Sequence, residues 1–284
     1  MYNVHGDLMK DFSELLLVSD FDRTLTDRNS RIPQANLDAI ADFEAKGGLF
    51  TLATGRSIPM FEAQAALVPS NAPLILYNGA AVYDGRTLSQ RVLLPDGPGL
   101  LRYLVENFPD LRVEVQGEQY HHLLGEDAMR DRFYRSNRAP SIHFTLREPP
   151  ANIMKIAVYG TFYDDTVRQF FSGSAEELAR LDEARARISR DWPDVVVDRS
   201  APRIIDIQHR SVSKGAAARA LASRLGRRLV CVGDASNDLS MLREGDLSFV
   251  PADCEEAVAK LGFTQVCPCD EGAIAGVVRA LAAL

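Results

Sequence analysis

Two aspartates stand two positions apart directly after the first strongly apolar run of the chain. The run is Leu15–Val18, and the acids are Asp20 and Asp22. Four consecutive apolar residues predict a strand buried on both faces, and ligands of open α/β sheets bind outside the carboxyl ends of such strands. Residues i and i+2 of an extended chain point the same way, so both carboxylates can face one small volume. At about 4 Å and an effective dielectric of about 20 they repel by about 4 kcal/mol, which a proton, a cation or a turn must offset. Aspartates also cap turns and helices, so a purely structural role stays open for the pair alone.

Polar residues also follow the other predicted strands. They are Thr54 after the strand 49–53, Asn78 after the strand 73–77, and Asp234, Asn237 and Asp238 after the strand 228–232. Lys214 stands in the first turn of a helix that Ser213 can cap. A helix N-terminus carries partial positive charge, which makes a lysine there unfavourable by about 0.3–1 kcal/mol. Lys214 is therefore either solvated or directed toward carboxylates or a phosphate at the strand ends.

The elements that must position these residues follow a strand–helix rhythm at both ends of the chain. The first part combines the strands 15–18, 49–53 and 73–77 with helices that begin near Pro33 and Pro59, the second running to about Leu67. The last part combines the strands 228–232 and 247–250 with helices over 213–226, 239–242, 255–261 and 272–284. This order predicts right-handed βαβ units on a parallel sheet.

The middle of the chain has a different rhythm, in which hairpins mix with helices. Asp84-Gly85 is a hairpin signal between two short strands. Further strands are expected at 111–116, 119–124, 153–159, 195–198 and 203–208, and helices at 97–107 and 175–190. We therefore expect an α/β protein with a Rossmann-like parallel-sheet core, residues 1–83 and 207–284. An inserted, mostly antiparallel α+β domain, residues 84–206, interrupts this core.

Composition excludes several classes of protein. The 284 residues suffice for one large or two ordinary domains, and the net charge of −7 argues against broad binding to nucleic acids or anionic membranes. No apolar run approaches the roughly 18 residues of a membrane span, and the first 14 residues lack the apolar core of a secretion signal, so we expect a cytoplasmic protein. The cysteines 231, 254, 267 and 269 lack the paired spacing of a zinc site and are expected to be reduced and structural.

The polar groups also resemble the motifs of a known family, the haloacid dehalogenase-like hydrolases, and in particular its Cof-like phosphatases with a large α/β cap. The four segments are Asp20-Phe21-Asp22-Arg23-Thr24-Leu25, then Leu52–Arg56, then Val212–Gly215, and finally Gly233–Asp238 with Met241-Leu242. They stand in the family's order, and the insert falls between the second and third, as in this branch. Each motif alone is weak evidence, whereas four in order are strong.

The resemblance implies roles for these residues. Asp20 would be the nucleophile that forms an aspartyl-phosphate, and Asp22 would protonate the leaving alcohol and then activate water. Lys214 would steady Asp20 and the transferring phosphoryl group. Mg²⁺ would be held by Asp20, Asp234 and the backbone carbonyl of Asp22, with Asp238 close by. The residues that would contact phosphate or substrate are Thr54, Gly55, Arg56, Asn78 and Asn237. Two of them leave a second reading open: Arg56 faces either substrate or a structural acid, and Asn78 is either the substrate-side asparagine of this branch or a structural residue at a strand end.

The implied protein is a Mg²⁺-dependent phosphatase of small phosphate monoesters, with sugar phosphates ahead of nucleotides or cofactor phosphates. The insert would be a cap that closes over the site, excludes water and chooses the leaving group. The partner would be a small phosphorylated metabolite, and the chain a monomer or weak homodimer. Two alternatives remain: a phosphomutase with the same core residues, and a phosphate-responsive binding or signalling domain in which the aspartyl-phosphate is a long-lived switch.

Three further features each leave two readings open. Arg23 occupies a position that is commonly glycine in the family, and it either lines the mouth of the site and alters substrate preference or is simply an exposed arginine over the loop. His121-His122 either reach substrate from the cap or form an exposed pair on a hairpin. Arg203 either binds an anionic substrate or forms a salt bridge.

Overall fold

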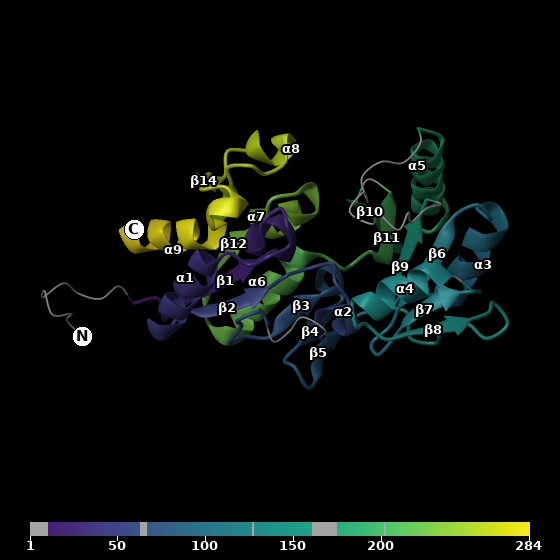
Figure 1. Cartoon of the computed structure of the whole chain (residues 1–284), viewed down its shortest axis with the longest axis horizontal. Coiled ribbons are helices and arrows are strands. Elements are labelled where there is room, and N and C mark those ends of the chain that lie inside the picture. Colours follow the sequence, from purple (N-terminus) through teal and green to yellow (C-terminus); the bar gives the residue numbers. More distant parts are fainter. Residues whose placement is uncertain (1–10, 63–66, 127, 161–174, 202) are drawn as a thin grey trace, which may run out of the picture. The chain divides into compact units, whose positions relative to one another are not determined.

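Two compact units make up the chain, and each contains segments that are distant in sequence (Figure 1). The computed structural model describes residues 11–62, 67–126, 128–160, 175–201 and 203–284. The first unit comprises Met1–Thr54, Val68–Ser89 and Ser213–Leu284. The second comprises Gly55–Leu67 and Gln90–Val212.

A five-stranded parallel sheet forms the centre of the first unit, in the order β14-β13-β12-β1-β2. The strands are β1 (Leu15–Ser19), β2 (Leu49–Leu52), β12 (Arg228–Val232), β13 (Leu247–Pro251) and β14 (Thr264–Val266). β1 lies between β12 and β2, and its residues Leu16, Leu17 and Val18 are fully buried, as expected for a strand covered on both faces. β1 is therefore a central strand, and its carboxyl end lies at the end of the sheet where ligands of open α/β sheets bind.

In the described part of the first unit, five helices accompany the sheet, and they confirm the predicted α/β core. They are α1 (Gln34–Ala45), α6 (Lys214–Leu225), α7 (Leu239–Glu244), α8 (Glu256–Ala259) and α9 (Ala273–Ala283). Leu16 and Val18 of β1 share one buried cluster with Leu221 of α6 and Met241 of α7. Contacts also join α1 to α9 and to β2. The β14 strand was not among the predicted elements.

The third predicted strand is present but pairs differently from the prediction. β3 (Leu74–Leu76) is antiparallel to β4 (Ala81–Tyr83), which neighbours β5 (Leu88–Arg91) in a separate three-stranded sheet. A single parallel bridge, Ala53 to Ile75, links β3 to the chain just beyond β2. The strand predicted at 73–77 is therefore present and touches the parallel sheet through this bridge, but its continuous ladder is with the antiparallel β4. The reason is the turn Tyr77–Gly79, whose three residues all have positive φ and which reverses the chain at once.

A six-stranded sheet forms the centre of the second unit, in the order β10-β11-β9-β6-β7-β8. The strands are β6 (Arg112–Gln116), β7 (His121–Leu124), β8 (Ser141–Phe144), β9 (Lys155–Tyr159), β10 (Val195–Ala201) and β11 (Ile204–His209). All of its neighbouring pairs are antiparallel except β7 with β8. The prediction of a mostly antiparallel α+β unit is confirmed.

The helices of the second unit are α2 (Ile58–Glu62), α3 (Gly97–Asn107), α4 (Ala128–Ser136) and α5 (Ala175–Asp191). Leu104 of α3 and Ile188 of α5 belong to one buried cluster with Ile156 of β9. α4 and β8 were not predicted, and α4 is unusual in being rich in charged residues. Of the helix expected from Pro59 to about Leu67, residues 63–66 lie outside the described residues.

The segment Gly55–Leu67 belongs to the second unit by its contacts, although the expected boundary had placed it in the α/β core. Lys155 Nζ donates a hydrogen bond to the Gly55 carbonyl oxygen at 2.7 Å. The Ser57 hydroxyl and His121 Nε2 lie 2.7 Å apart. These polar contacts with β9 and β7 explain why the segment groups with a sheet that comes later in the chain.

Two expectations from composition concern the chain as a whole. The four cysteines are free, and Cys231 and Cys269 are buried, as expected for structural thiols. Burial raises the pKa of the Cys231 thiol well above its usual value, which makes it less reactive. Within the described ranges, no helix combines the length and apolar character that crossing a membrane requires.

Candidate active site

Asp20 continues β1 by one residue and begins a wide helical turn, Phe21–Leu25. The Asp20 N–H donates to the carbonyl oxygen of Val232, the last residue of β12, at 2.9 Å. The turn closes with a hydrogen bond from the Thr26 N–H to the Phe21 carbonyl oxygen at 3.0 Å. Asp20 is only 7% exposed. The sheet and the turn together therefore fix the backbone that carries this carboxylate.

Asp22 lies within this turn and is exposed, in contrast to Asp20. Its backbone is extended, with φ −77° and ψ 125°, and the following Arg23 is left-handed, with φ 60°. The Asp22 carboxylate lies close enough to Asp20 to contribute to the raised pKa of that group. The structure thus places the two acids near each other but in different environments, one buried and one accessible.

Lys214 is the buried cation of the site. Ser213 caps α6 by accepting a hydrogen bond from the Ala216 N–H at 3.0 Å, which places Lys214 in the first turn of the helix. Lys214 Nζ lies 2.6 Å from Asp20 Oδ1 and 2.6 Å from Asp238 Oδ1, and its side chain is 1% exposed. Burial alone would lower the pKa of Lys214, but the two carboxylates outweigh burial and raise it. The lysine is therefore directed toward carboxylates and is not solvated.

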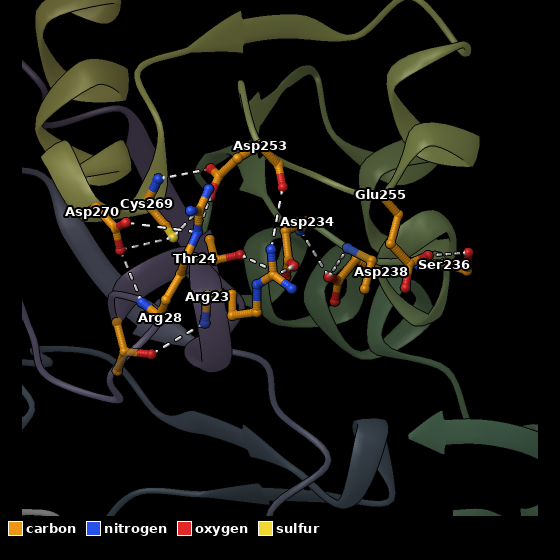
Figure 2. Close-up of polar contacts among 12 residues, drawn as sticks. Arg23, Thr24, Arg28, Asp234, Ser236, Asp238, Asp253, Glu255, Cys269 and Asp270 are labelled. Atoms are coloured by element: carbon orange, nitrogen blue, oxygen red, sulfur yellow. Dashed lines mark hydrogen bonds and ion pairs between the residues drawn. The ribbon is translucent and has the colours of Figure 1, made fainter. Parts of the chain in front are cut away.

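The loop after β12 supplies two more acids. Asp238 Oδ2 accepts hydrogen bonds from the N–H groups of Asp234 and Ala235, both at 3.1 Å. Asp234 Oδ1 accepts a hydrogen bond from the Thr24 hydroxyl at 3.1 Å, which ties this loop to the turn after β1 (Figure 2). Asp234 is 6% exposed and Asp238 is fully buried. The two segments are thus joined through side chains of the candidate site itself.

The carboxylates of Asp20, Asp234 and Asp238 form a group suited to a metal ion. One oxygen of each lies within 4.8 Å of the others. Burial and then the Asp238 charge raise the pKa of Asp20, and the same two causes raise the pKa of Asp234 to about 7. One lysine does not balance three acids, so a divalent cation that prefers oxygen ligands fits the deficit of positive charge. The Asp22 side chain is not part of this group.

The candidate phosphate contacts divide between the two units. Thr54 and Asn78 meet in the first unit, where the Asn78 N–H donates to the Thr54 carbonyl oxygen at 2.9 Å. Asn237 is half-buried in the short turn Ser236–Asp238 that precedes α7. Gly55 and Arg56 belong to the second unit. The first unit therefore brings together Asp20, Lys214, Asp234 and Asp238 through side-chain ion pairs and close carboxylate oxygens, while Gly55 and Arg56 belong to the other unit.

Two further candidates, His121 and Arg203, have structural partners in the second unit. His121 is 1% exposed and lies between Ser57 and Glu114, its Nδ1 2.7 Å from Glu114 Oε1. The reading of an exposed histidine pair is therefore wrong for His121. Arg203 Nη2 lies 2.6 Å from Glu177 Oε2, so the salt-bridge reading is confirmed for this residue.

Sequence reasoning missed two partners of Asp234. The Thr24 hydroxyl bonds to one oxygen of that carboxylate, and Arg23 Nε lies 4.0 Å from the other. Its place in the motif after Asp22 was the only local sign that Thr24 belongs to the site. Its pairing with a residue 210 positions later is a consequence of the parallel pairing of β1 with β12.

Comparison with known proteins gives one family. A family model described as "haloacid dehalogenase-like hydrolase" matches residues 17–276. A Bacillus subtilis (strain 168) protein named "Putative phosphatase YxeH" is 28% identical over 239 residues, which cover 80% of this chain and 83% of that protein. A Streptococcus pyogenes protein, "Putative phosphatase M6_Spy0533", is 27% identical over 239 residues, which also cover 80% of this chain and 83% of that protein.

Solved structures share the fold. A haloacid dehalogenase-like hydrolase from Bacteroides thetaiotaomicron has a TM-score of 0.76 at 18% identity, covering 94% of this chain and 98% of that one. A protein described as the "HAD Subclass IIB Sugar Phosphatase BT4131" has a TM-score of 0.74 at 19% identity, covering 95% and 99%. The protein TM0651 from Thermotoga maritima has a TM-score of 0.73 at 20% identity, covering 93% and 96%.

Proposed function

Because the chain belongs to the haloacid dehalogenase-like hydrolases, we propose that it is a Mg²⁺-dependent phosphatase of small phosphate monoesters. Sugar phosphates are the favoured class, which agrees with the description of one structural neighbour as a sugar phosphatase. The names of the two relatives in sequence point to the same activity. The observation that carries the proposal is the convergence of Asp20, Asp234 and Asp238 around the buried Lys214.

In the first step, the Asp20 carboxylate attacks phosphorus. A bond forms between an Asp20 oxygen and phosphorus, and the bond from phosphorus to the ester oxygen breaks. The ester oxygen leaves with the bonding electron pair and takes a proton from Asp22, which releases the alcohol. Asp20 must be ionised for this attack. Lys214, 2.6 Å from Asp20 Oδ1, favours the ionised form and balances charge on the transferring phosphoryl group.

In the second step, water hydrolyses the aspartyl-phosphate. Asp22, now ionised, accepts a proton from the water as its oxygen attacks phosphorus. The bond between phosphorus and Asp20 breaks, and its electron pair returns to the carboxylate. The products are inorganic phosphate and the original enzyme. The exposure of Asp22 suits this exchange of a proton with an alcohol and then with water.

Asp20, Asp234 and Asp238, with the Asp22 carbonyl, are the residues that would hold Mg²⁺. When bound, the ion would neutralise charge on the phosphoryl oxygens and on the carboxylates. We assign catalysis to the first unit. We assign choice of substrate to the second unit, in the role of a cap. The residues that we propose as contacts to phosphate or substrate are Thr54, Gly55, Arg56, Asn78 and Asn237.

The test is phosphate release from p-nitrophenyl phosphate and from a panel of sugar phosphates, with Mg²⁺ and with a chelator. Asp20→Asn keeps the shape of the side chain but removes the nucleophile, so turnover should fall by about 10⁴-fold or more. Mass spectrometry of acid-quenched enzyme should find a phosphoryl adduct in the unmodified protein and none in this variant. Asp38→Asn, on the exposed face of α1, is the matched control and should keep full activity.

Other outcomes would reject the proposal. Near-normal activity of Asp20→Asn contradicts the assignment of the nucleophile. An isomeric sugar phosphate formed without free phosphate would indicate a phosphomutase. One phosphoryl group per chain with no further turnover would indicate a phosphate-responsive switch.

A further inference from the structure

Arg23 occupies a backbone conformation that favours glycine. Its φ is 60° and its ψ is 12°, in the left-handed region where an L side chain is strained and glycine is not. The Arg23 N–H donates to Thr26 Oγ1 at 3.1 Å, and Thr26 is 1% exposed, so the turn fixes this conformation. An arginine at this position costs stability that glycine would not, which directs attention to what its side chain does.

The contacts of the Arg23 side chain are too weak to offset that cost. Its Nη2 lies 3.4 Å from the Asp253 carbonyl oxygen, its Nε lies 4.0 Å from Asp234 Oδ2, and the side chain is 54% exposed (Figure 2). Long contacts of a half-exposed side chain contribute little to stability. Arg28 differs, because its Nη2 lies 2.9 Å from Asp253 Oδ2 and its Nε also bonds to that oxygen. A structural role therefore suits Arg28 and not Arg23.

Most donors of the Arg23 guanidinium are available to a ligand. A guanidinium has five N–H groups in a planar fork. Within the part of the chain that the structure describes, one of them makes a hydrogen bond, to the Asp253 carbonyl oxygen. The guanidinium is thus held loosely beside Asp234, with capacity to bind a second group.

The position of Arg23 matches the path of the leaving group. Asp22, the preceding residue, must reach the ester oxygen to protonate it, so the substituents next to that oxygen lie near the turn Phe21–Leu25. Asp22 and Asp234 make this edge of the site acidic. A second negative charge on the leaving group would be repelled there unless a cation faced it. Among the described side chains that the site brings together, Lys214 is committed to two carboxylates, and Arg23 is the accessible cation.

We propose that Arg23 binds a second anionic group of the substrate, a carboxylate or a further phosphate on the leaving group close to the ester oxygen. The inference rests on the proposed phosphatase function and narrows its substrate class to phosphate monoesters with a second anion. The planar fork of arginine matches both groups, since either can accept two parallel hydrogen bonds. Arg23 acts in binding and orientation and takes no part in bond making.

The test compares pairs of substrates that differ in the second anion. Suitable pairs are 3-phosphoglycerate with glycerol 3-phosphate, and a hexose bisphosphate with the corresponding monophosphate. The unmodified enzyme should prefer the member with the second anion in at least one pair. Arg23→Gly should lower kcat/KM for that member about 10- to 100-fold, the factor expected for one lost charge-assisted interaction, and leave its partner almost unchanged. Arg23→Lys keeps the positive charge and loses the planar fork of donors. Its kcat/KM for the substrate with the second anion should lie between the values of the unmodified enzyme and of Arg23→Gly.

Two control variants separate recognition from strain and from general charge. Arg138 is exposed, lies in the second unit and has φ 56°, so Arg138→Gly relieves comparable backbone strain. Both Arg23→Gly and Arg138→Gly should raise Tm slightly, but only Arg23→Gly should change the preference between paired substrates. Arg28→Gln removes a neighbouring positive charge and should leave the preference intact.

The outcomes separate this inference from the function on which it rests. If no phosphate ester is hydrolysed, the proposed function itself fails. If esters are hydrolysed but no pair shows a preference, or Arg23→Gly slows both members alike, the role of Arg23 is rejected. Direct titration of Mg²⁺ by calorimetry adds a readout besides activity. An altered metal affinity with an equal loss for both members would show that Arg23 acts only through Asp234. An equal effect of Arg28→Gln would show that only the total charge of the loop matters.

Discussion

Lys214 keeps its charge in a position where almost no solvent reaches it. A buried ammonium is costly unless it is paired and hydrogen-bonded, and the oxygens of Asp20 and Asp238 at 2.6 Å supply both conditions. Neither acid is near Lys214 in sequence. The charge of each group therefore depends on the presence of the others, and the three side chains act as one unit.

Glu114, in the second unit, is likewise a buried charged group that is stabilised by hydrogen-bonded and oppositely charged partners. Its Oε1 accepts hydrogen bonds from His121 Nδ1 at 2.7 Å and from Gln116 Nε2 at 3.1 Å, and its Oε2 accepts one from the Tyr159 hydroxyl at 3.1 Å. Arg130 Nη2 lies 3.8 Å from Oε2. Burial alone would raise the pKa of Glu114, but His121 and then Arg130 outweigh burial and lower it to about 2.

The lowered pKa of Glu114 predicts a pH dependence of stability. In the unfolded chain the group titrates near 4.5, so between about pH 4.5 and 2 the unfolded state binds more protons than the folded state. The contribution of Glu114 is therefore complete above pH 4.5 and is lost as pH falls toward 2, by about 3 kcal/mol in all. Glu114→Gln should be less stable than the unmodified protein at pH 7, and the difference should shrink at pH 3. Urea unfolding at both pH values measures it, and a difference that does not change with pH would contradict the assignment.

At the level of elements, the approach of α6 to α7 decides where Lys214 lies. Gly215 follows Lys214, and a Cβ at this position would lie 2.1 Å from the Ser240 carbonyl oxygen. The Gly215 N–H also donates to Ser240 Oγ at 3.3 Å. Glycine is a poor helix former, so its presence in the first turn of α6 is explained by the close contact of two backbones.

Gly215→Ala tests this contact. Helix propensity alone favours alanine by about 1 kcal/mol, yet the clash with Ser240 should make the variant less stable by about 1–3 kcal/mol. A displaced α6 should also lower kcat, because Lys214 moves with it. Gly226→Ala is the control: its φ is 64° but the space around it is open, so only the backbone cost applies and activity should be kept. Denaturation curves measure the stability of both variants, and steady-state kinetics measure their activity. A Gly215→Ala variant as stable as the unmodified protein would show that α6 and α7 can move apart without cost.

At the level of the whole molecule, the carboxylate group joins the start of the chain to its last quarter. Asp20 comes from the first strand, whereas Asp234 and Asp238 come from the loop after β12. A cation bound by all three would bind the folded chain and not the unfolded one. Metal binding is therefore coupled to the stability of the first unit.

Mg²⁺ should accordingly raise Tm. At a concentration about 100 times Kd the added stability is about 3 kcal/mol, and chelator should reverse it. Asp234→Asn removes one ligand and should abolish most of this shift. Asp246→Asn alters an acid that pairs with Arg219 on the surface, and this variant should keep the Tm shift caused by Mg²⁺. Scanning calorimetry with and without Mg²⁺ measures these shifts. An unchanged Tm of the unmodified protein at millimolar Mg²⁺ would count against the site.

Features that depend only on neighbouring residues could be predicted from the amino-acid sequence. The apolar runs identified β1, β2 and β12, the Ser213 cap identified the start of α6, and the order of four motifs identified the family. These succeeded because burial on both faces, capping and motif spacing are all written within short segments.

The contacts between distant groups, in contrast, could be seen only in the folded chain. The fold paired β3 with the antiparallel β4, buried His121 against Glu114 and Ser57, and placed Gly55–Leu67 with the second unit. It also set the guanidinium of Arg23 beside Asp234. The physical reason is that a periodic pattern reports whether a residue is buried, whereas its partner depends on strand pairing and turn geometry across the whole chain.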